Sequence, residues 1–160
     1  MNGKVVMPTI ALLFMAMIAI SPAMAMNKAP YWEHVEGAAT GPPGKVWTCG
    51  NIMHIEDLPW SGSYVGTLGN GVIDCNFKHI TVNMVTGEGT SMSTWQITID
   101  GNTLSGSANG MITGGLTGTN DGYFRGTHGT GAFEGIQKMG TYHVDLAKGI
   151  LDAEGVIIYH

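Results

Sequence analysis

The histidines and acidic side chains are the groups in this chain whose types and spacing could do chemistry. His128 and His143 lie on two β-like segments that flank one glycine-rich loop, so we expect these segments to pair. Asp145 follows His143 by two residues, which places both side chains on the same face of a strand. The spacing predicts a polar cluster of His128, His143 and Asp145 on one wall of a sheet. The competing interpretation, which we favour, is an ordinary exposed polar face.

Motifs for metal or hydrolytic chemistry are absent from the sequence. The histidines form no HxH or HExxH pair, so a zinc site lacks local support. There is no GxSxG nucleophile motif, and the adjacent Glu56 and Asp57 would point to opposite faces of a strand. We therefore expect no metal and no cofactor, and the sequence assigns no catalytic residue.

Aromatic residues supply a second kind of candidate site. Trp95 and Tyr123 lie in strand-like segments, and their side chains could line a cavity that holds a small ligand. In so small a domain, aromatic side chains are more often part of the packed core. Both interpretations stay open.

The first 25 residues have the organisation of a secretory signal peptide. Lys4 gives a positive start, residues 5–20 are almost entirely apolar, and Ala23-Met24-Ala25 fits the small-x-small rule for cleavage. An uncleaved membrane anchor is the rival interpretation, but the apolar run is shorter than the ~18 residues typical of a spanning helix. We expect a secreted or periplasmic protein with no transmembrane segment after cleavage.

After the predicted signal peptide, the pattern changes at residue 45. Residues 26–44 contain Pro30, Pro42 and Pro43 without periodicity, so we interpret them as an N-terminal extension that is at most partly ordered. Residues 45–160 have the pattern and length of one β domain.

Charge makes a nucleic-acid partner improbable. The chain has seven Lys and Arg against twelve Asp and Glu, a formal net charge of −5. The basic residues are scattered singly, whereas a nucleic-acid surface needs clustered cations to replace counterions. We expect no nucleic-acid partner.

The two cysteines, Cys49 and Cys75, predict a disulfide if the chain is exported. A pair of free thiols is the alternative. The isolated cysteines do not form the CxxC motif of a redox or zinc site.

Segments of alternating apolar and polar residues recur from residue 45 onward, with residues 79–85 and 95–99 as clear examples. Asp100-Gly101 indicates a tight hairpin, because type I′ turns need positive φ at both central positions. Asn109-Gly110 and Asp121-Gly122 repeat this signal. Eight or nine strands with short connections predict an all-β fold, an antiparallel eight-stranded up-and-down barrel. A β-sandwich is the alternative.

Residues 129–136 have the composition of a compact structural loop. Gly129, Gly131 and Gly135 allow tight backbone turns, and Phe133 and Ile136 are apolar anchors that could plug one end of a barrel. A phosphate-binding loop is the rival interpretation, but no GK[ST] is present and no helix follows.

The stretch GTGAFEGIQKMGTYHV, residues 129–144, resembles a segment of bacterial secreted proteins with an allene oxide cyclase-like barrel. Dirigent proteins share that fold group, and GSYVGTLGNG, residues 62–71, is compatible with it. The resemblance implies an eight-stranded antiparallel barrel with a central, largely apolar cavity. It transfers no catalytic residue to this chain, and a shared fold is weak support for a shared activity.

Three functions are compatible with this sequence. The leading hypothesis is an exported, non-catalytic barrel that binds a small apolar or aromatic ligand in its cavity. The alternative is an isomerase or cyclase of the allene oxide cyclase kind, whose chemistry needs little more than a shaped cavity and a few orienting groups. The third is a structural or surface interaction module, which would form homo-oligomers.

Overall fold

A computed structural model describes residues 27–160 of the chain. The described chain is all-β, with two short 3-10 turns at Gly115–Thr117 (η1) and Gly131–Phe133 (η2). Its nine strands are β1 (Asn27–Ala39), β2 (Lys45–Cys49), β3 (Ile52–Gly66), β4 (Gly69–Asn83), β5 (Gly89–Ile99), β6 (Asn102–Thr113), β7 (Thr119–Gly129), β8 (Gln137–Asp145) and β9 (Ile150–Tyr159). The predicted signal peptide, residues 1–25, lies outside the described residues.

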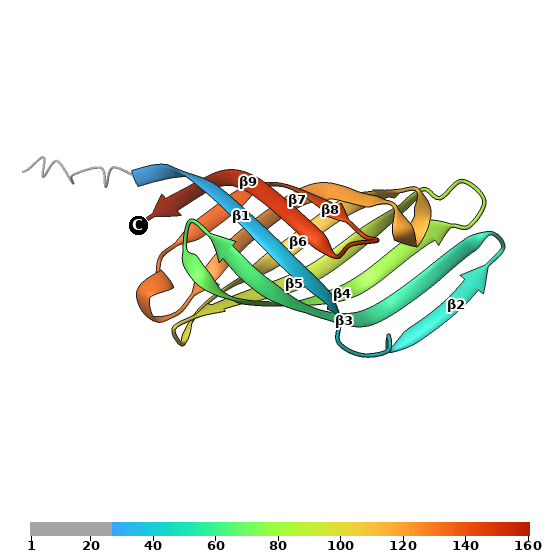
Figure 1. Cartoon of the computed structure of the whole chain (residues 1–160), viewed down its shortest axis with the longest axis horizontal. Coiled ribbons are helices and arrows are strands. Elements are labelled where there is room, and N and C mark those ends of the chain that lie inside the picture. Colours follow the sequence, from blue (N-terminus) through green and yellow to red (C-terminus); the bar gives the residue numbers. More distant parts are fainter. Residues whose placement is uncertain (1–26) are drawn as a thin grey trace, which may run out of the picture.

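Eight strands close into an antiparallel barrel, as the sequence predicts, and the β-sandwich alternative is not adopted. Strands β3 to β9 pair in chain order, and β1 closes the sheet by pairing with both β9 and β3. Figure 1 shows β1 running across the barrel between these two partners. Closure leaves none of the eight strands with an unpaired edge along its whole length.

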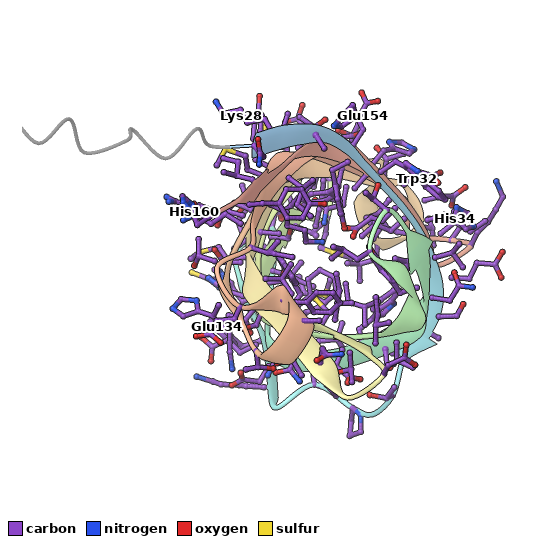
Figure 2. The ribbon with its side chains drawn as sticks, turned by 90° about the vertical axis from the view of Figure 1, so that its left-hand side faces the viewer. Lys28, Trp32, His34, Glu134, Glu154 and His160 are labelled. Atoms are coloured by element: carbon purple, nitrogen blue, oxygen red, sulfur yellow. The ribbon has the colours of Figure 1, made fainter. Side chains whose placement is uncertain are left out.

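The prediction of a poorly ordered N-terminal extension is wrong for residues 27–39. This segment is β1, in which Tyr31, Glu33 and Val35 are buried and alternate with Trp32 and His34. Figure 2 shows Trp32 and His34 pointing away from the barrel. The alternation is hard to recognise in the sequence because a charged residue, Glu33, occupies an inward position.

The ninth strand, β2, lies outside the closed barrel. After Ala39 the chain bends through residues 40–44, which include Pro42 and Pro43, and then continues along β3 as Lys45–Cys49. The pairing of β9 with β1 ends at Glu36, so β2 and the adjoining ends of β3 and β4 project past the barrel (Figure 1). We call this projection, residues 45–58 and 77–83, the outer ribbon.

The strand register sets the width of the barrel. One inward-facing row can be followed around it through cross-strand partners: Trp60, Cys75, Trp95, Gly106, Gly126, Lys138, Ile157 and Ala29. Because Trp60 also pairs with Ala39, the row returns to β1 displaced by ten residues (39 minus 29). Eight strands with this stagger are tilted by roughly 35–45°, and such a barrel has room for side chains plus one small ligand.

Two glycines in this row make space for the indole of Trp95. A Cβ atom at Gly126 would lie 2.4 Å from Trp95 Cη2, and one at Gly106 would lie 2.5 Å from Trp95 Cζ2. Both distances are well inside van der Waals contact. The indole therefore lies against the bare backbone of β6 and β7 and reaches toward Lys138 on β8.

The loop between β7 and β8 closes one end of the barrel. Phe133 and Ile136 are buried in the main core there. Gly131 and Gly135 have positive φ values of 59° and 75°, and a Cβ at Gly129 would lie 1.8 Å from the Phe133 carbonyl oxygen. The tight backbone of this loop therefore depends on its glycines.

Only one of three predicted Asx-Gly turns is a turn. Asp100 and Gly101 have φ values of 50° and 79° and connect β5 to β6, which confirms that hairpin. Gly110 and Gly122 instead pair with each other in the middle of β6 and β7. A Cβ at Gly110 would lie 2.2 Å from the Tyr142 hydroxyl, so this glycine leaves space for a side chain rather than making a turn.

The predicted disulfide is not formed, and both cysteines are free. Cys49 pairs with Ile52 and Ile52 with Asn83, which is eight positions (83 minus 75) along β4 from Cys75. At ~3.3 Å per residue this separation is roughly 26 Å, whereas a disulfide needs Cα atoms within about 7 Å. The outer ribbon carries Cys49 away from the barrel.

Substitution of Gly126 by alanine tests the packing of the Trp95 indole. We expect Gly126→Ala to lower the free energy of unfolding by about 1–3 kcal/mol, because the new methyl group overpacks the core. Urea denaturation measures the change. Gly41→Ala is the matched control, because its Cβ would meet only Pro59 at an ordinary 3.5 Å. In a Trp95→Phe background the smaller ring leaves room for the methyl group, so Gly126→Ala should lower the free energy of unfolding by less. An equal loss of stability in both backgrounds would contradict this packing.

Candidate functional site

The barrel contains a partly open cavity in the half opposite the β7–β8 loop. Its volume is about 420 Å³, and its lining is mainly apolar, with Ile55, Trp60, Phe77, Ile80, Ile112 and Phe124 among the larger contributors. Small side chains such as Ala108, Ser91 and Ser93 leave the space unfilled. The mouth lies where Ala39, Leu116 and Lys148 meet the lining.

Backbone hydrogen bonds join neighbouring loops around the mouth. The donor and acceptor pairs are Gly37 N to Gly149 O (2.9 Å), Leu146 N to Gly118 O (2.9 Å), Gly115 N to Gly87 O (2.8 Å) and Met84 N to Asn51 O (2.8 Å). Three of these bonds link two different connections between strands, and the bond from Gly37 N links β1 to the connection between β8 and β9. The rim is therefore tied together by backbone hydrogen bonds, as expected for a preformed site.

A few polar side chains interrupt the apolar wall. Asn120 Nδ2 donates to Ser91 Oγ at 2.9 Å. Burial raises the pKa of the Tyr142 hydroxyl, which faces the same pair. Burial also raises the pKa of the Cys75 thiol to about 11, so this cavity-lining group is a neutral thiol rather than a nucleophilic thiolate near pH 7.

A buried ion pair lies at the inner limit of the cavity. Lys138 Nζ on β8 donates to Glu33 Oε2 on β1 at 2.7 Å, and the two side chains are 1 % and 5 % exposed. Lys138 Nζ also donates to the Tyr31 hydroxyl at 2.7 Å. Glu33 lines the cavity, whereas Lys138 lies behind it. The cation is thus shielded from the cavity by its own partners.

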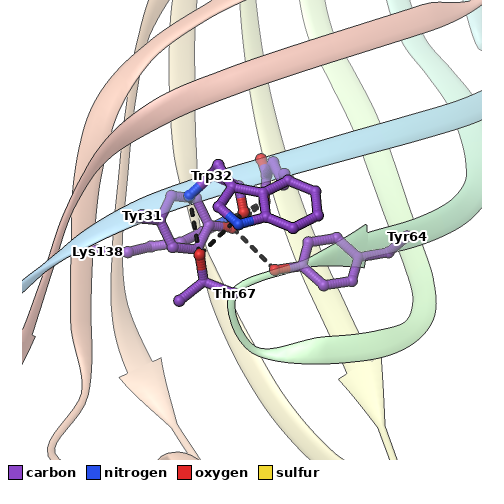
Figure 3. Close-up of polar contacts among 6 residues, drawn as sticks. Tyr31, Trp32, Tyr64, Thr67 and Lys138 are labelled. Atoms are coloured by element: carbon purple, nitrogen blue, oxygen red, sulfur yellow. Dashed lines mark hydrogen bonds and ion pairs between the residues drawn. The ribbon is translucent and has the colours of Figure 1, made fainter.

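Two tyrosines complete the hydrogen-bond network (Figure 3). Tyr31 donates its hydroxyl proton to Glu33 Oε2, and its oxygen lies 3.1 Å from the Tyr64 hydroxyl. Because the single proton of Tyr31 goes to Glu33, Tyr64 is the donor in the second bond. Burial, with the nearby Glu33 carboxylate, raises the pKa of both phenols. Both tyrosines are therefore neutral donors.

Aromatic rings surround the Lys138 ammonium. Nζ lies 4.2 Å from the ring centroid of Trp95, 4.7 Å from that of Tyr31 and 4.9 Å from that of Phe124. Burial lowers the pKa of Lys138, and the Glu33 carboxylate opposes this shift. Cation–π attraction also favours the charged form. The geometry is that of an ammonium held by one carboxylate and several π faces.

The second oxygen of Glu33 is the polar atom of this network that remains for a ligand. The hydrogen bonds from Tyr31 and Lys138 both reach Oε2, and no described residue donates a hydrogen bond to Oε1. Since Glu33 lines the cavity, Oε1 can accept a hydrogen bond from a hydroxyl or amide of a bound molecule. The ion pair keeps this carboxylate electrically balanced.

The predicted polar cluster does not exist. His143 pairs with Asp121 across β7 and β8 and lies 2.6 Å from its carboxylate. His128 is seven positions (128 minus 121) further along β7, roughly 23 Å away at ~3.3 Å per residue. Asp145 instead contacts Lys148 at 2.7 Å. His128 and His143 are exposed on the outer wall, which agrees with the simpler interpretation.

The two aromatic candidates, Trp95 and Tyr123, lie on opposite faces of the barrel wall. Trp95 is buried and lines the cavity. Tyr123 is 73 % exposed on the outer face of β7. Their contrast follows from the alternation of strand positions, which the sequence alone does not assign to an inside or an outside.

Glu33 and Lys138 cannot be recognised as a site from the sequence, although one signal for the burial of Lys138 is present. The inward positions of β8 include Tyr142 and Val144, and the same alternation extends back to Lys138. A lysine at such a position is ordinarily exposed. Only the buried carboxylate on a strand more than a hundred residues earlier makes this placement stable.

No group of three or more His, Cys, Asp or Glu side chains in the described part of the chain could hold a metal ion. Within residues 27–160, no helix has the length and apolarity needed to cross a membrane. Comparison with protein-family models, curated proteins and solved structures found no match.

Removal of one member of the ion pair should be much more costly than removal of both. We expect Lys138→Met to lower the free energy of unfolding by about 3–5 kcal/mol, because Glu33 is then a buried charge without a partner. The double variant Lys138→Met/Glu33→Gln should recover a large part of this loss in urea denaturation. Strictly additive effects of the two substitutions would contradict a direct coupling.

The tyrosine network should make stability fall at alkaline pH. A raised pKa means that Tyr31 and Tyr64 stay protonated in the folded state while the unfolded chain ionises above about pH 10. Their stabilising contribution is complete below that pH and is lost as pH rises above it. We expect the free energy of unfolding to fall less steeply between pH 9 and 11 in Tyr31→Phe than in the wild type. Parallel pH profiles would show that Tyr31 does not contribute.

Proposed function

We propose that the barrel binds a small apolar or aromatic ligand in its cavity without changing the ligand chemically. The observation that carries this proposal is the preformed, mainly apolar cavity of about 420 Å³ with a mouth at one end of the barrel. Cavities of this size that bury most of a ligand's surface are typical of small-molecule sites. The predicted signal peptide is compatible with an exported carrier.

The polar groups of the cavity define how such a ligand would be oriented. Glu33 Oε1 accepts hydrogen bonds at the inner limit, and Ser93 and Asn120 provide further polar atoms on the wall. The Tyr142 hydroxyl and the Trp95 indole N–H, which has no hydrogen-bond partner among the described residues, also belong to lining residues, and the remaining lining offers contact surface. The fitting ligand is a mainly apolar molecule with few hydrogen-bonding groups, at least one of which is a donor.

An isomerase or cyclase of the allene oxide cyclase kind is the second candidate, and the carboxylate of Glu33 in an apolar cavity favours it. Such a group can act as a general base. However, proton uptake by Glu33 would leave the Lys138 ammonium buried without its counter-charge, which is unfavourable. Conversion of an unsaturated fatty-acid epoxide by the purified protein would decide for this candidate.

Ligand binding is tested by filling the cavity. Ala108 is buried and lines the cavity, so Ala108→Phe places a ring where the ligand would lie. With the neutral fluorescent probe N-phenyl-1-naphthylamine, we expect blue-shifted emission on binding to the wild type and at least about tenfold weaker binding to the variant.

Ser107→Phe is the matched control for this substitution. Ser107 is the neighbouring residue on β6 and is exposed on the outer face, so the control adds the same ring outside the barrel. Probe binding should be unchanged in the control, and thermal unfolding should show both variants folded. Equal probe binding by Ala108→Phe and wild type would place the probe elsewhere and refute the proposed cavity site.

A further inference from the structure

Exposed apolar side chains gather beside the mouth of the cavity. Met84 and Val85, in the connection between β4 and β5, are 62 % and 73 % exposed. Leu116, in η1, is 44 % exposed and also lines the cavity. We call Met84, Val85 and Leu116 the mouth patch.

The members of the mouth patch belong to loops that are joined to each other. Gly115 N donates to Gly87 O at 2.8 Å, so the loop that carries Leu116 is bonded to the loop that carries Met84 and Val85. On the outer ribbon, Val46 pairs with Ile55, which lines the cavity, and Val46 is itself exposed. Exposed apolar side chains thus occur on two joined loops next to the cavity and on the outer ribbon.

Charge is nearly absent from the loops around the mouth. Residues 40–44, 84–88, 114–118 and 146–149 contain one acidic residue, Glu88, and one basic residue, Lys148. Lys148 is paired with Asp145 at the end of β8, at 2.7 Å. The rim therefore presents mainly apolar side chains and small uncharged residues, with Glu88 and the paired Lys148 as its charged groups, although the chain as a whole has a net charge of −5.

We propose that the mouth patch docks reversibly on the surface of an electrically neutral lipid layer, and that ligand passes between this layer and the cavity. Docking would bury Met84, Val85 and Leu116 in the interfacial region of the lipid. An apolar ligand then moves into the cavity without crossing water. This inference rests on the proposed function, because it gives the cavity a source for its ligand.

The composition of the patch favours lipid over a protein partner. Protein interfaces are enriched in aromatic residues, Met and Arg, and need about 800 Å² per partner, which is more than three partly exposed side chains supply. The mouth patch consists of aliphatic and thioether side chains on loops, without an aromatic ring or an arginine. A lipid layer needs no shape complementarity. The negative net charge and the lack of a basic cluster favour neutral over anionic lipid.

Vesicles of pure phosphatidylcholine test the proposal directly. We expect the full chain to co-sediment with these vesicles. With N-phenyl-1-naphthylamine loaded into the vesicles, the rate of transfer to the protein should increase with vesicle concentration, as for transfer by collision. Transfer through water would give a rate that does not depend on vesicle concentration.

The double variant Met84→Ser/Val85→Ser removes apolar surface from the rim without touching the cavity lining. We expect at least about fivefold less vesicle-bound protein and an equal loss of collisional transfer, with unchanged affinity for the probe in solution. Val72→Ser/Met92→Ser is the matched control, because these residues are similarly exposed on the barrel wall. The control should behave as the wild type.

Each alternative occupant of the patch has a distinct result that would overturn the proposal. Binding only after phosphatidylglycerol is added would indicate electrostatic attraction. A dimer in solution that the rim variant abolishes would make the patch a protein interface. Failure of the probe to bind the cavity in solution would refute the proposed function, whereas co-sedimentation would still decide docking. A wild type that neither co-sediments nor transfers by collision refutes the docking.

Discussion

Closure of the barrel by β1 is the constraint on which the rest of the structure depends. The strand pairs with β9 on one side and β3 on the other, which removes two sheet edges at once. The same strand carries Tyr31 and Glu33 into the interior. Without them, Lys138 would have no counter-charge within the barrel, and a buried lone ammonium is strongly destabilising. Backbone pairing and the central ion pair therefore require each other.

The interior is filled unevenly, and this uneven filling creates the cavity. Toward the β7–β8 loop, large side chains such as Phe133, Ile97 and Leu104 pack into a continuous core. Toward the mouth, Ala108 and Ser91 occupy inward positions that a fully packed core would give to larger residues. The network around Lys138 lies between these two halves. It joins five strands at the depth where close packing stops.

Alternation and turn chemistry are local properties, so the sequence predicts the strands and the all-β barrel well. The Asp100-Gly101 hairpin is predicted because few pairs of residues readily adopt positive φ at two adjacent positions. Asn109-Gly110 predicts a turn for the same local reason, and the sequence does not reveal the Tyr142 hydroxyl, on a distant strand, that needs the space at Gly110. The number of cysteines likewise says nothing about the distance between them in the fold. The pairing of Glu33 with Lys138 depends on closure, which no short window of sequence contains.

The balanced charge of the inner network limits what the cavity can hold. Lys138 and Glu33 neutralise each other, and Tyr31 and Tyr64 are uncharged donors, so no net charge is left to attract an ion. An ionised ligand would lose its hydration without gaining a counter-charge, and that exchange is costly in an apolar cavity. A neutral ligand with a donor group avoids this cost and can bond to Glu33 Oε1. The rim, which carries few charges, acts in the same direction, because it favours contact with apolar phases over charged partners.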